Sequence, residues 1–323
     1  MKEAERETFE SLVAALRGGA EAVCLSGLTS IPAKAYFAAR LRKAIGRPVV
    51  IVTPETRDLE TWSANLAFFA DHFGGTAESI AVFPAFETDP YSGASPHPDT
   101  ERLRAETLWR LASETPDILI TSATALAARI VSPGDVADAG CRLSLGSEIP
   151  PERLMSKLVA AGYVREDPVT SIGQFSVRGG IIDVWPPDRE LPVRLDFFGD
   201  ELDSIRSFDP GTQLSTGKLN AVDLAPMREL VAEPDDLRLW AAEAEERFTS
   251  PELARGLRDR LAFAEHGETF SGWEFLFPLV RALRSCILDH LDKHVLLIDE
   301  PVAAEASIAE LHANTARHFA ESL

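Results

Sequence analysis

Two neighbouring stretches, GQFSVRGGIIDVWPP (173–187) and ELPVRLDFFGDELDSIRSFD (190–209), carry the clearest structural pattern in this sequence. Apolar and polar residues alternate along both, with many Val, Ile and Phe, which is the period-two pattern of half-buried β-strands. Gly-Gly, Pro-Pro and Gly-Asp pairs interrupt the alternation and mark tight turns. The two stretches therefore predict an antiparallel sheet with one apolar face.

The residues before this sheet follow another pattern, in which short apolar runs alternate with helical segments. We expect strands over 20–26, 48–53, 79–83 and 117–121, and helices over 33–45, 57–73 and 100–113. The proline-rich stretch 84–99 is expected to be a loop. Strands that alternate with helices predict a parallel α/β sheet.

The residues after the sheet are mostly helical. We expect helices over 233–247, 252–264, 273–284 and 302–320, and one strand over 295–298. A lone buried strand needs a sheet to join, so this strand is predicted to return to the first domain. The predicted organisation is an α/β domain built from 1–133 and 229–323, with 134–228 (the insert) as an inserted, mainly antiparallel α+β domain that includes a helix over 151–161.

Composition excludes several classes of protein. The 323 residues include 32 Lys and Arg against 51 Asp and Glu, a net charge of −19, which disfavours extensive nonspecific binding of nucleic acid. Three scattered cysteines exclude a disulfide scaffold and a CxxC metal site. No apolar run approaches the ~20 residues of a membrane span, and the first residues do not form a secretory signal. We expect a cytoplasmic protein.

A strand, a Gly-containing loop and a helix at 22–41 stand where a phosphate-binding P-loop would lie. Gly27 can serve as the first glycine of that motif, and Lys34 as its lysine. Neither possible register restores the second glycine and the hydroxyl residue, and Pro32 removes a backbone donor. We therefore expect a degenerate nucleotide loop, represented by Gly27 and Lys34, that does not hydrolyse ATP.

Other candidate catalytic and metal residues have simpler explanations. Asp299 and Glu300 follow the strand 295–298 as a magnesium-binding acidic pair would, but without a phosphate cradle we interpret them as a relic or a helix cap. His290 and His294 are spaced for zinc on a predicted helix, yet no third ligand is evident. No nucleophile–base pair is found. We expect no catalytic residue, no metal and no cofactor in this chain.

The insert carries a more unusual feature, a polar sheet face with several arginines. Period-two alternation places Ser176 and Arg178 on the face opposite Phe175 and Val177. On the strand at 193–198, Arg194 and Asp196 share the polar face in the same way, and Arg165 lies just before the sheet. Two interpretations stay open, a solvated face with cross-strand ion pairs and a small cationic patch that binds an acidic protein surface.

The region 163–209 resembles the domain shared by the excision-repair helicase UvrB and the transcription-repair coupling factors. The resemblance rests on FSVRG (175–179), IDVWP (182–186) and RLDFFGDE (194–201). The connection 83–111 is similar to the short version found in coupling factors. UvrB has a long Tyr-rich hairpin there and an intact P-loop, and this chain lacks both, so the resemblance favours the coupling factors.

This resemblance implies a fold and a partner. The fold is a degenerate, P-loop- and helicase-like parallel α/β domain with the insert, and the insert is expected to bind UvrA through Arg165, Arg178, Arg194 and Asp196. Ser176 stands where UvrB has another arginine. The complete family protein is an ATP-dependent DNA translocase, so this chain is expected to be a fragment. RNA polymerase, DNA, ATP and magnesium would be bound by the parts it lacks.

Two alternatives belong to other functional classes. A nucleotide-hydrolysing helicase fragment related to UvrB would use the strand–loop–helix at 22–41 with Asp299 and Glu300. A weak DNA-binding module would use the arginine face of the insert, and its affinity would fall steeply with added salt.

Overall fold

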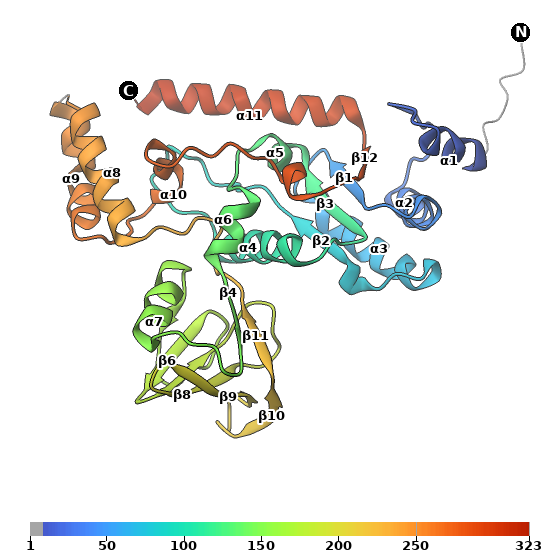
Figure 1. The fold of residues 1–323 in the computed structure, drawn as a ribbon. Coiled ribbons are helices and arrows are strands. Elements are labelled where there is room, and N and C mark those ends of the chain that lie inside the picture. The colour runs from blue at the N-terminus through green and yellow to red at the C-terminus, as the bar shows by residue number, and fades with distance from the viewer. Residues whose placement is uncertain (1–8, 250, 323) are drawn as a thin grey trace, which may run out of the picture. The chain divides into compact units, whose positions relative to one another are not determined.

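The chain folds into two compact units that together contain one parallel and two largely antiparallel sheets (Figure 1). The computed structural model describes residues 9–249 and 251–322. The first unit comprises 1–85, 114–128 and 291–313, and the second comprises 86–113, 129–290 and 314–323. This mixed α/β content agrees with the predicted fold class. The predicted boundaries after residues 133 and 228 stay predictions.

The first unit is built around a four-stranded parallel sheet with the order β12-β1-β3-β2. Its elements are α1 (Phe9–Arg17), α2 (Ile31–Ile45), β1 (Val49–Thr53), α3 (Asp58–Phe73), η1 (Ala77–Ser79), β2 (Ile80–Phe83), β3 (Ile118–Ser122), α5 (Ala123–Ala127), β12 (Val295–Ile298) and the start of α11 (Pro301–Ser322). Strand β12 pairs with β1, which confirms that the strand predicted over 295–298 returns to the first sheet.

Helices α2 and α3 cover one face of this sheet. Alternate residues of β1, Val49 and Ile51, pack with Trp62 and Leu66 of α3 and with the alanines of α2 in one buried cluster. Small Ala35, Ala38 and Ala39 let α2 approach the strands closely. The apolar runs of β1 and β3 are buried throughout, as expected for strands covered on both faces.

The strand predicted over 20–26 is wrong. Those residues form no strand, and Glu21, Cys24 and Leu25 are exposed. They line an apolar groove beside β12 without entering its hydrogen-bond ladder, so β12 is an edge strand. A short apolar run forms a strand only where its side chains can pack on a neighbouring, half-buried sheet. Most of the residues in 20–26 are exposed to solvent instead.

The second unit contains the insert and the helices that flank it. Its elements are α4 (Pro98–Ser113), α6 (Pro133–Ala139), β4 (Cys141–Ser144), α7 (Pro151–Ala160), β5 (Val164–Arg165), β6 (Gln174–Arg178), β7 (Ile181–Val184), β8 (Val193–Phe198), β9 (Glu201–Phe208), β10 (Ser215–Leu219), β11 (Ala221–Leu224), α8 (Pro234–Arg247), α9 (Pro251–Glu265), α10 (Trp273–Leu276), η2 (Phe277–Leu279) and η3 (Ile287–His290). The helix expected over 273–284 ends at Leu276, because Pro278 cannot continue its hydrogen bonds.

The insert has its own core between a six-stranded sheet and two smaller layers. The sheet order is β10-β9-β8-β7-β6-β5, antiparallel except for the β5–β6 pair. Its apolar face, represented by Phe175, Ile182 and Leu195, packs against Leu154 and Leu158 of α7 and against the β4–β11 ribbon. The opposite face is therefore the one that carries the polar residues of the alternating pattern.

A cluster of buried charges lies elsewhere in the second unit. Arg104 of α4 forms an ion pair with Glu229 at 2.7 Å, and both side chains are almost fully buried. Glu101, one turn earlier on α4, lies near the carboxylate of Glu274 and the guanidinium of Arg228. Within residues 9–249 and 251–322, no helix combines the length and the apolar character that a membrane span needs.

Glu101 predicts a pH dependence of stability. Burial and the neighbouring Glu274 raise the pKa of Glu101 from 4.5 to about 7. A carboxyl whose pKa is raised on folding stabilises the fold below its unfolded pKa, and this stabilisation is lost as the pH rises from about 4.5 to 7. We expect Glu101→Gln to increase the free energy of unfolding at pH 8, by roughly 3 kcal/mol at most. Urea unfolding at pH 5 and pH 8 measures this, and an equal effect of the substitution at both pH values would contradict it.

Candidate functional site

The polar face of the insert brings together residues that are far apart in the sequence. Strand register places Ser176, Asp183, Arg194 and Arg206 in one row across β6, β7, β8 and β9. Strand β7 separates β6 from β8, so the two predicted arginine strands do not pair directly. Arg178 and Asp196 lie on the same face, because the register pairs both of them with Ile181 of β7.

Arg194 is held in a fixed orientation by a buried partner. Its Nε and Nη2 donate to the two carboxylate oxygens of Asp183 at 2.7 and 2.8 Å. Asp183 is buried, only 18% of the Arg194 side chain is exposed, and the guanidinium lies 4.7 Å from the centroid of the Phe208 ring. The hydrogen bond to Asp183 raises the pKa of Arg194. This two-pronged pair orients the arginine and leaves little of it for a partner.

Arg178 is in a different environment. It forms an ion pair with Asp167, and about half of each side chain is exposed. The hydrogen bond from Arg178 lowers the pKa of Asp167, and the positive charge of Arg165 acts in the same direction. Register pairs Arg165, on the edge strand β5, with Phe175, whose side chain lies in the core, so Arg165 lies at the sheet edge and is not part of the polar face. Arg165 forms no ion pair with any residue that the structure describes.

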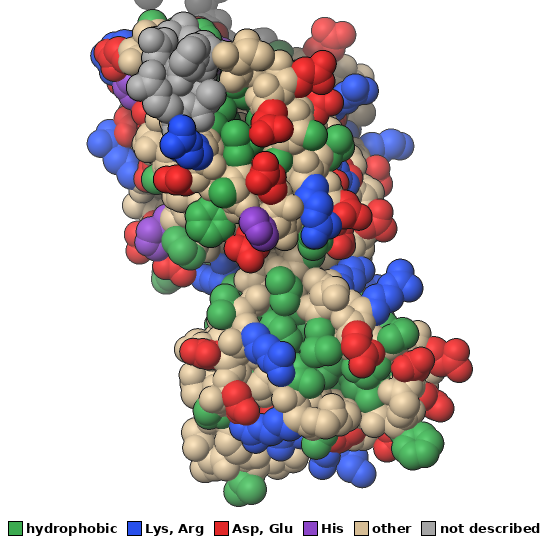
Figure 2. Space-filling view, turned by 90° about the vertical axis from the view of Figure 1, so that its left-hand side faces the viewer, with side chains coloured by type: hydrophobic (Ala, Val, Ile, Leu, Met, Phe, Trp, Pro, Cys, Tyr) green, Lys and Arg blue, Asp and Glu red, His purple; other side chains and the backbone are tan. Residues whose placement is uncertain are grey.

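Asp196 completes the set of predicted residues. It accepts a hydrogen bond of 2.5 Å from the Ser204 hydroxyl and forms an ion pair with Arg206. The face thus carries three ion pairs, Arg178–Asp167, Arg194–Asp183 and Arg206–Asp196. These three arginines are therefore not a patch of free cations, because each one forms an ion pair with an aspartate. Figure 2 shows basic, acidic and hydrophobic side chains interleaved on one side of the insert.

Phe198 is a candidate that the sequence analysis missed. It lies at the end of β8, in the turn before β9, and 84% of it is exposed. Phe198 lies on the same strand as Arg194, and aromatic residues are enriched at protein–protein interfaces, so Phe198 is a candidate contact residue. The signal was the second phenylalanine of FFGDE (197–201), which breaks the apolar–polar alternation just before a Gly-Asp turn.

The degenerate nucleotide loop lies in the first unit. Lys34, in the first turn of α2, donates to Asp299 Oδ1 at 2.5 Å and to Glu300 Oε1 at 2.7 Å. Burial acts to lower the pKa of Lys34, but the hydrogen bonds and charges of both carboxylates outweigh it and raise that pKa. The same hydrogen bond lowers the pKa of Glu300. Gly27 has a φ of 92°, a conformation that favours glycine.

This ion triad explains the acidic pair. The sequence predicts a relic or a helix cap at Asp299 and Glu300, and the structure shows that both carboxylates form ion pairs with Lys34 of the loop. In a P-loop enzyme the lysine binds phosphate and the acidic residue binds magnesium. Here the lysine and the two carboxylates form ion pairs with each other at the carboxyl end of β12.

The remaining histidine candidates do not form a site. His290 ends the short 3-10 helix η3, and its Nε2 lies 3.0 Å from the Val131 carbonyl oxygen, whereas His294 lies outside any helix. The helix predicted to carry both is therefore wrong. In the described part of the chain, no three His, Cys, Asp or Glu side chains are arranged to hold a metal ion.

Comparison with known proteins identifies relatives of the chain. Residues 141–230 match the UvrB interaction domain family. The transcription-repair-coupling factor of Myxococcus xanthus is 32% identical over 311 residues, which cover 92% of this chain. The chain is homologous to the transcription-repair-coupling factors.

Other transcription-repair-coupling factors show the same relationship. That of Mycobacterium bovis is 29% identical over 98% of this chain, and that of Haemophilus influenzae is 29% identical over 77%. The chain spans 26% and 21% of those two proteins, and 25% of the Myxococcus xanthus protein. The polar face with Arg178, Arg194 and Asp196 lies inside the match to the UvrB interaction domain, as does Arg165 at the sheet edge, and the ion triad lies outside it.

Proposed function

We propose that this chain is a non-catalytic module that recruits UvrA through its UvrB interaction domain. The observation that carries the proposal is the match over 141–230, which contains the polar face with Arg178 and the exposed Phe198. An arginine–aspartate pair and an exposed aromatic ring together suit a partner surface that offers carboxylates around an apolar pocket.

The four predicted residues have different roles in this proposal. Exposed ion pairs contribute about 0–1 kcal/mol, so Arg178 can exchange Asp167 for an acidic group of a partner at little cost. Arg165 is exposed and is available directly. Arg194 and Asp196 are engaged by Asp183 and Arg206, and they position the face. Contact with UvrA therefore rests on Arg165, Arg178 and Phe198.

Replacing Arg178 by alanine is expected to weaken UvrA binding by ~2 kcal/mol, or about 30-fold in Kd. Isothermal titration of the chain into purified UvrA measures the change. Arg153→Ala is the matched control, because Arg153 is an exposed cation on α7, which packs on the opposite face of the same sheet. An affinity that is the same for Arg178→Ala and for the unsubstituted chain would remove Arg178 from the interface.

The proposal extends to the longer protein. Within a transcription-repair-coupling factor, the module would link a stalled RNA polymerase to nucleotide excision repair in the bacterial cytoplasm. DNA, RNA polymerase, ATP and magnesium would be bound by regions outside this chain, among them an ATP-dependent translocase motor. The chain itself would need no cofactor.

The ion triad supports the absence of catalysis in the module. Lys34, Asp299 and Glu300 satisfy one another's charges, so phosphate and magnesium would both have to break these contacts. We expect ATP turnover by the purified chain to equal that of buffer. Turnover above buffer that disappears in Lys34→Ala would contradict this and would favour a nucleotide-hydrolysing helicase fragment.

A further inference from the structure

A charged hollow lies at the amino ends of the strands in the first unit, opposite the end that carries the ion triad. Its volume is about 1000 Å³. Three cations line it, Arg42 near the end of α2, Arg47 in the α2–β1 loop and Lys293 just before β12. Asp117, immediately before β3, and Asp292 also line it.

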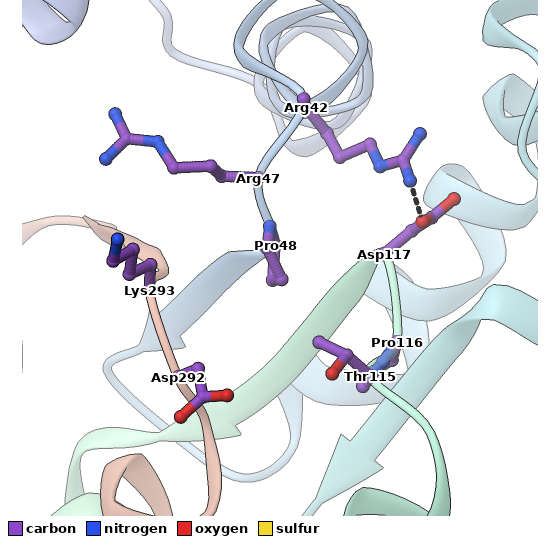
Figure 3. A pocket seen from close by; sticks show the side chains of 9 residues that line it. Arg42, Arg47, Pro48, Thr115, Pro116, Asp117, Asp292 and Lys293 are labelled. Atoms are coloured by element: carbon purple, nitrogen blue, oxygen red, sulfur yellow. Dashed lines mark hydrogen bonds and ion pairs between the residues drawn. The ribbon is translucent and has the colours of Figure 1, made fainter.

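The three cations differ in their ion pairs. Arg42 forms an ion pair with Asp117, marked in Figure 3. Neither Arg47 nor Lys293 forms an ion pair with a residue in the described ranges. Figure 3 shows Arg47 and Lys293 extending to the same side of the hollow, with the Asp292 carboxylate turned away from them. Two unpaired cations in one hollow are unexpected in a chain whose net charge is −19.

Arg42 has a different orientation from these two cations. Its side chain extends toward Asp117, to the other side of the hollow (Figure 3), and its Nε is buried. The cations that a ligand in the hollow can reach are therefore Arg47 and Lys293.

We propose that this hollow binds a phosphate group, either free or as the monoester of a small molecule. Guanidinium and ammonium groups from separate segments match the several oxygens and the double charge of phosphate, and the Thr115 hydroxyl at the rim adds a donor. A long nucleic acid fits less well, because a chain with a net charge of −19 repels its backbone. The site is independent of UvrA binding.

Titration of the whole chain with inorganic phosphate at constant ionic strength, followed by amide NMR, tests the proposal. We expect saturable shifts of the Gly46, Arg47 and Asp117 amides. The variant Arg47→Gln/Lys293→Gln removes two exposed or half-buried cations and is expected to weaken binding by at least about tenfold. Lys43→Gln/Lys157→Gln removes two cations outside the hollow and is expected to bind as the unsubstituted chain does.

Two further titrations distinguish the sources of the phosphate. Glucose 6-phosphate that binds tighter than inorganic phosphate would support a small phosphorylated ligand, and equal affinity would support free phosphate. An oligonucleotide that shifts the same amides at much lower concentration, with a steep salt dependence, would overturn the proposal. So would the absence of saturable shifts, or identical phosphate affinity in the Arg47→Gln/Lys293→Gln variant.

Discussion

Arg104→Met is expected to lower the free energy of unfolding of the second unit by about 3–5 kcal/mol. The substitution leaves the Glu229 carboxylate buried without its cation, since only 4% of the Glu229 side chain is exposed. It also removes the guanidinium that lies 4.1 Å from the centroid of the Phe86 ring. Urea unfolding monitored by tryptophan fluorescence measures the loss.

Two variants distinguish the effect of the unpaired Glu229 carboxylate from a general sensitivity of α4 to substitution. Arg102→Met removes an ion pair with Glu106 on the same helix, where about a third of each side chain is exposed, and is expected to cost less than about 1 kcal/mol. Arg104→Met/Glu229→Met removes both buried charges and is expected to recover most of the lost stability. A double variant as unstable as Arg104→Met would show that lost packing, rather than the uncompensated carboxylate, causes the effect.

Arg194→Met is expected to destabilise the insert by about 3 kcal/mol, because Asp183 is buried under it and loses both hydrogen bonds. Arg178→Met, which breaks the exposed pair with Asp167, is expected to change stability by less than about 1 kcal/mol. Thermal and urea unfolding of the two variants compare them directly. Equal stability losses would contradict the distinction between a positioning arginine and a contact arginine. An affinity measured on Arg194→Met is informative only at a temperature where the variant is folded.

The sheet of the insert was predictable from sequence because the alternation of apolar and polar residues along each strand indicates it without knowledge of distant contacts. Alternation over 173–187 and 190–209 gives both the strands and the face that each residue occupies, and the register confirms the polar face. The segment 20–26 has strand-like composition, but strand formation depends on a neighbour, and no local pattern reports that the segment stays unpaired beside β12.

The candidate site was predictable only in part for the same reason. Alternation places Arg178 and Arg194 on one face, yet their partners differ in burial, and that difference follows from the packing around Asp183. The Lys34–Asp299 contact joins residues 265 positions apart, and it depends on β12 returning to β1. The residues of the triad were therefore each visible in the sequence, whereas their mutual neutralisation required the structure.

Isothermal titration of this chain into purified UvrA tests the central claim most directly, with Arg165→Ala/Arg178→Ala as the interface variant and Arg153→Ala/Lys157→Ala as the matched control. The proposed function predicts that the unsubstituted chain and the control variant bind with similar affinity, and that the interface variant, although folded, loses binding. A folded, unsubstituted chain that does not bind UvrA, or an interface variant that binds as tightly as the control, would contradict it.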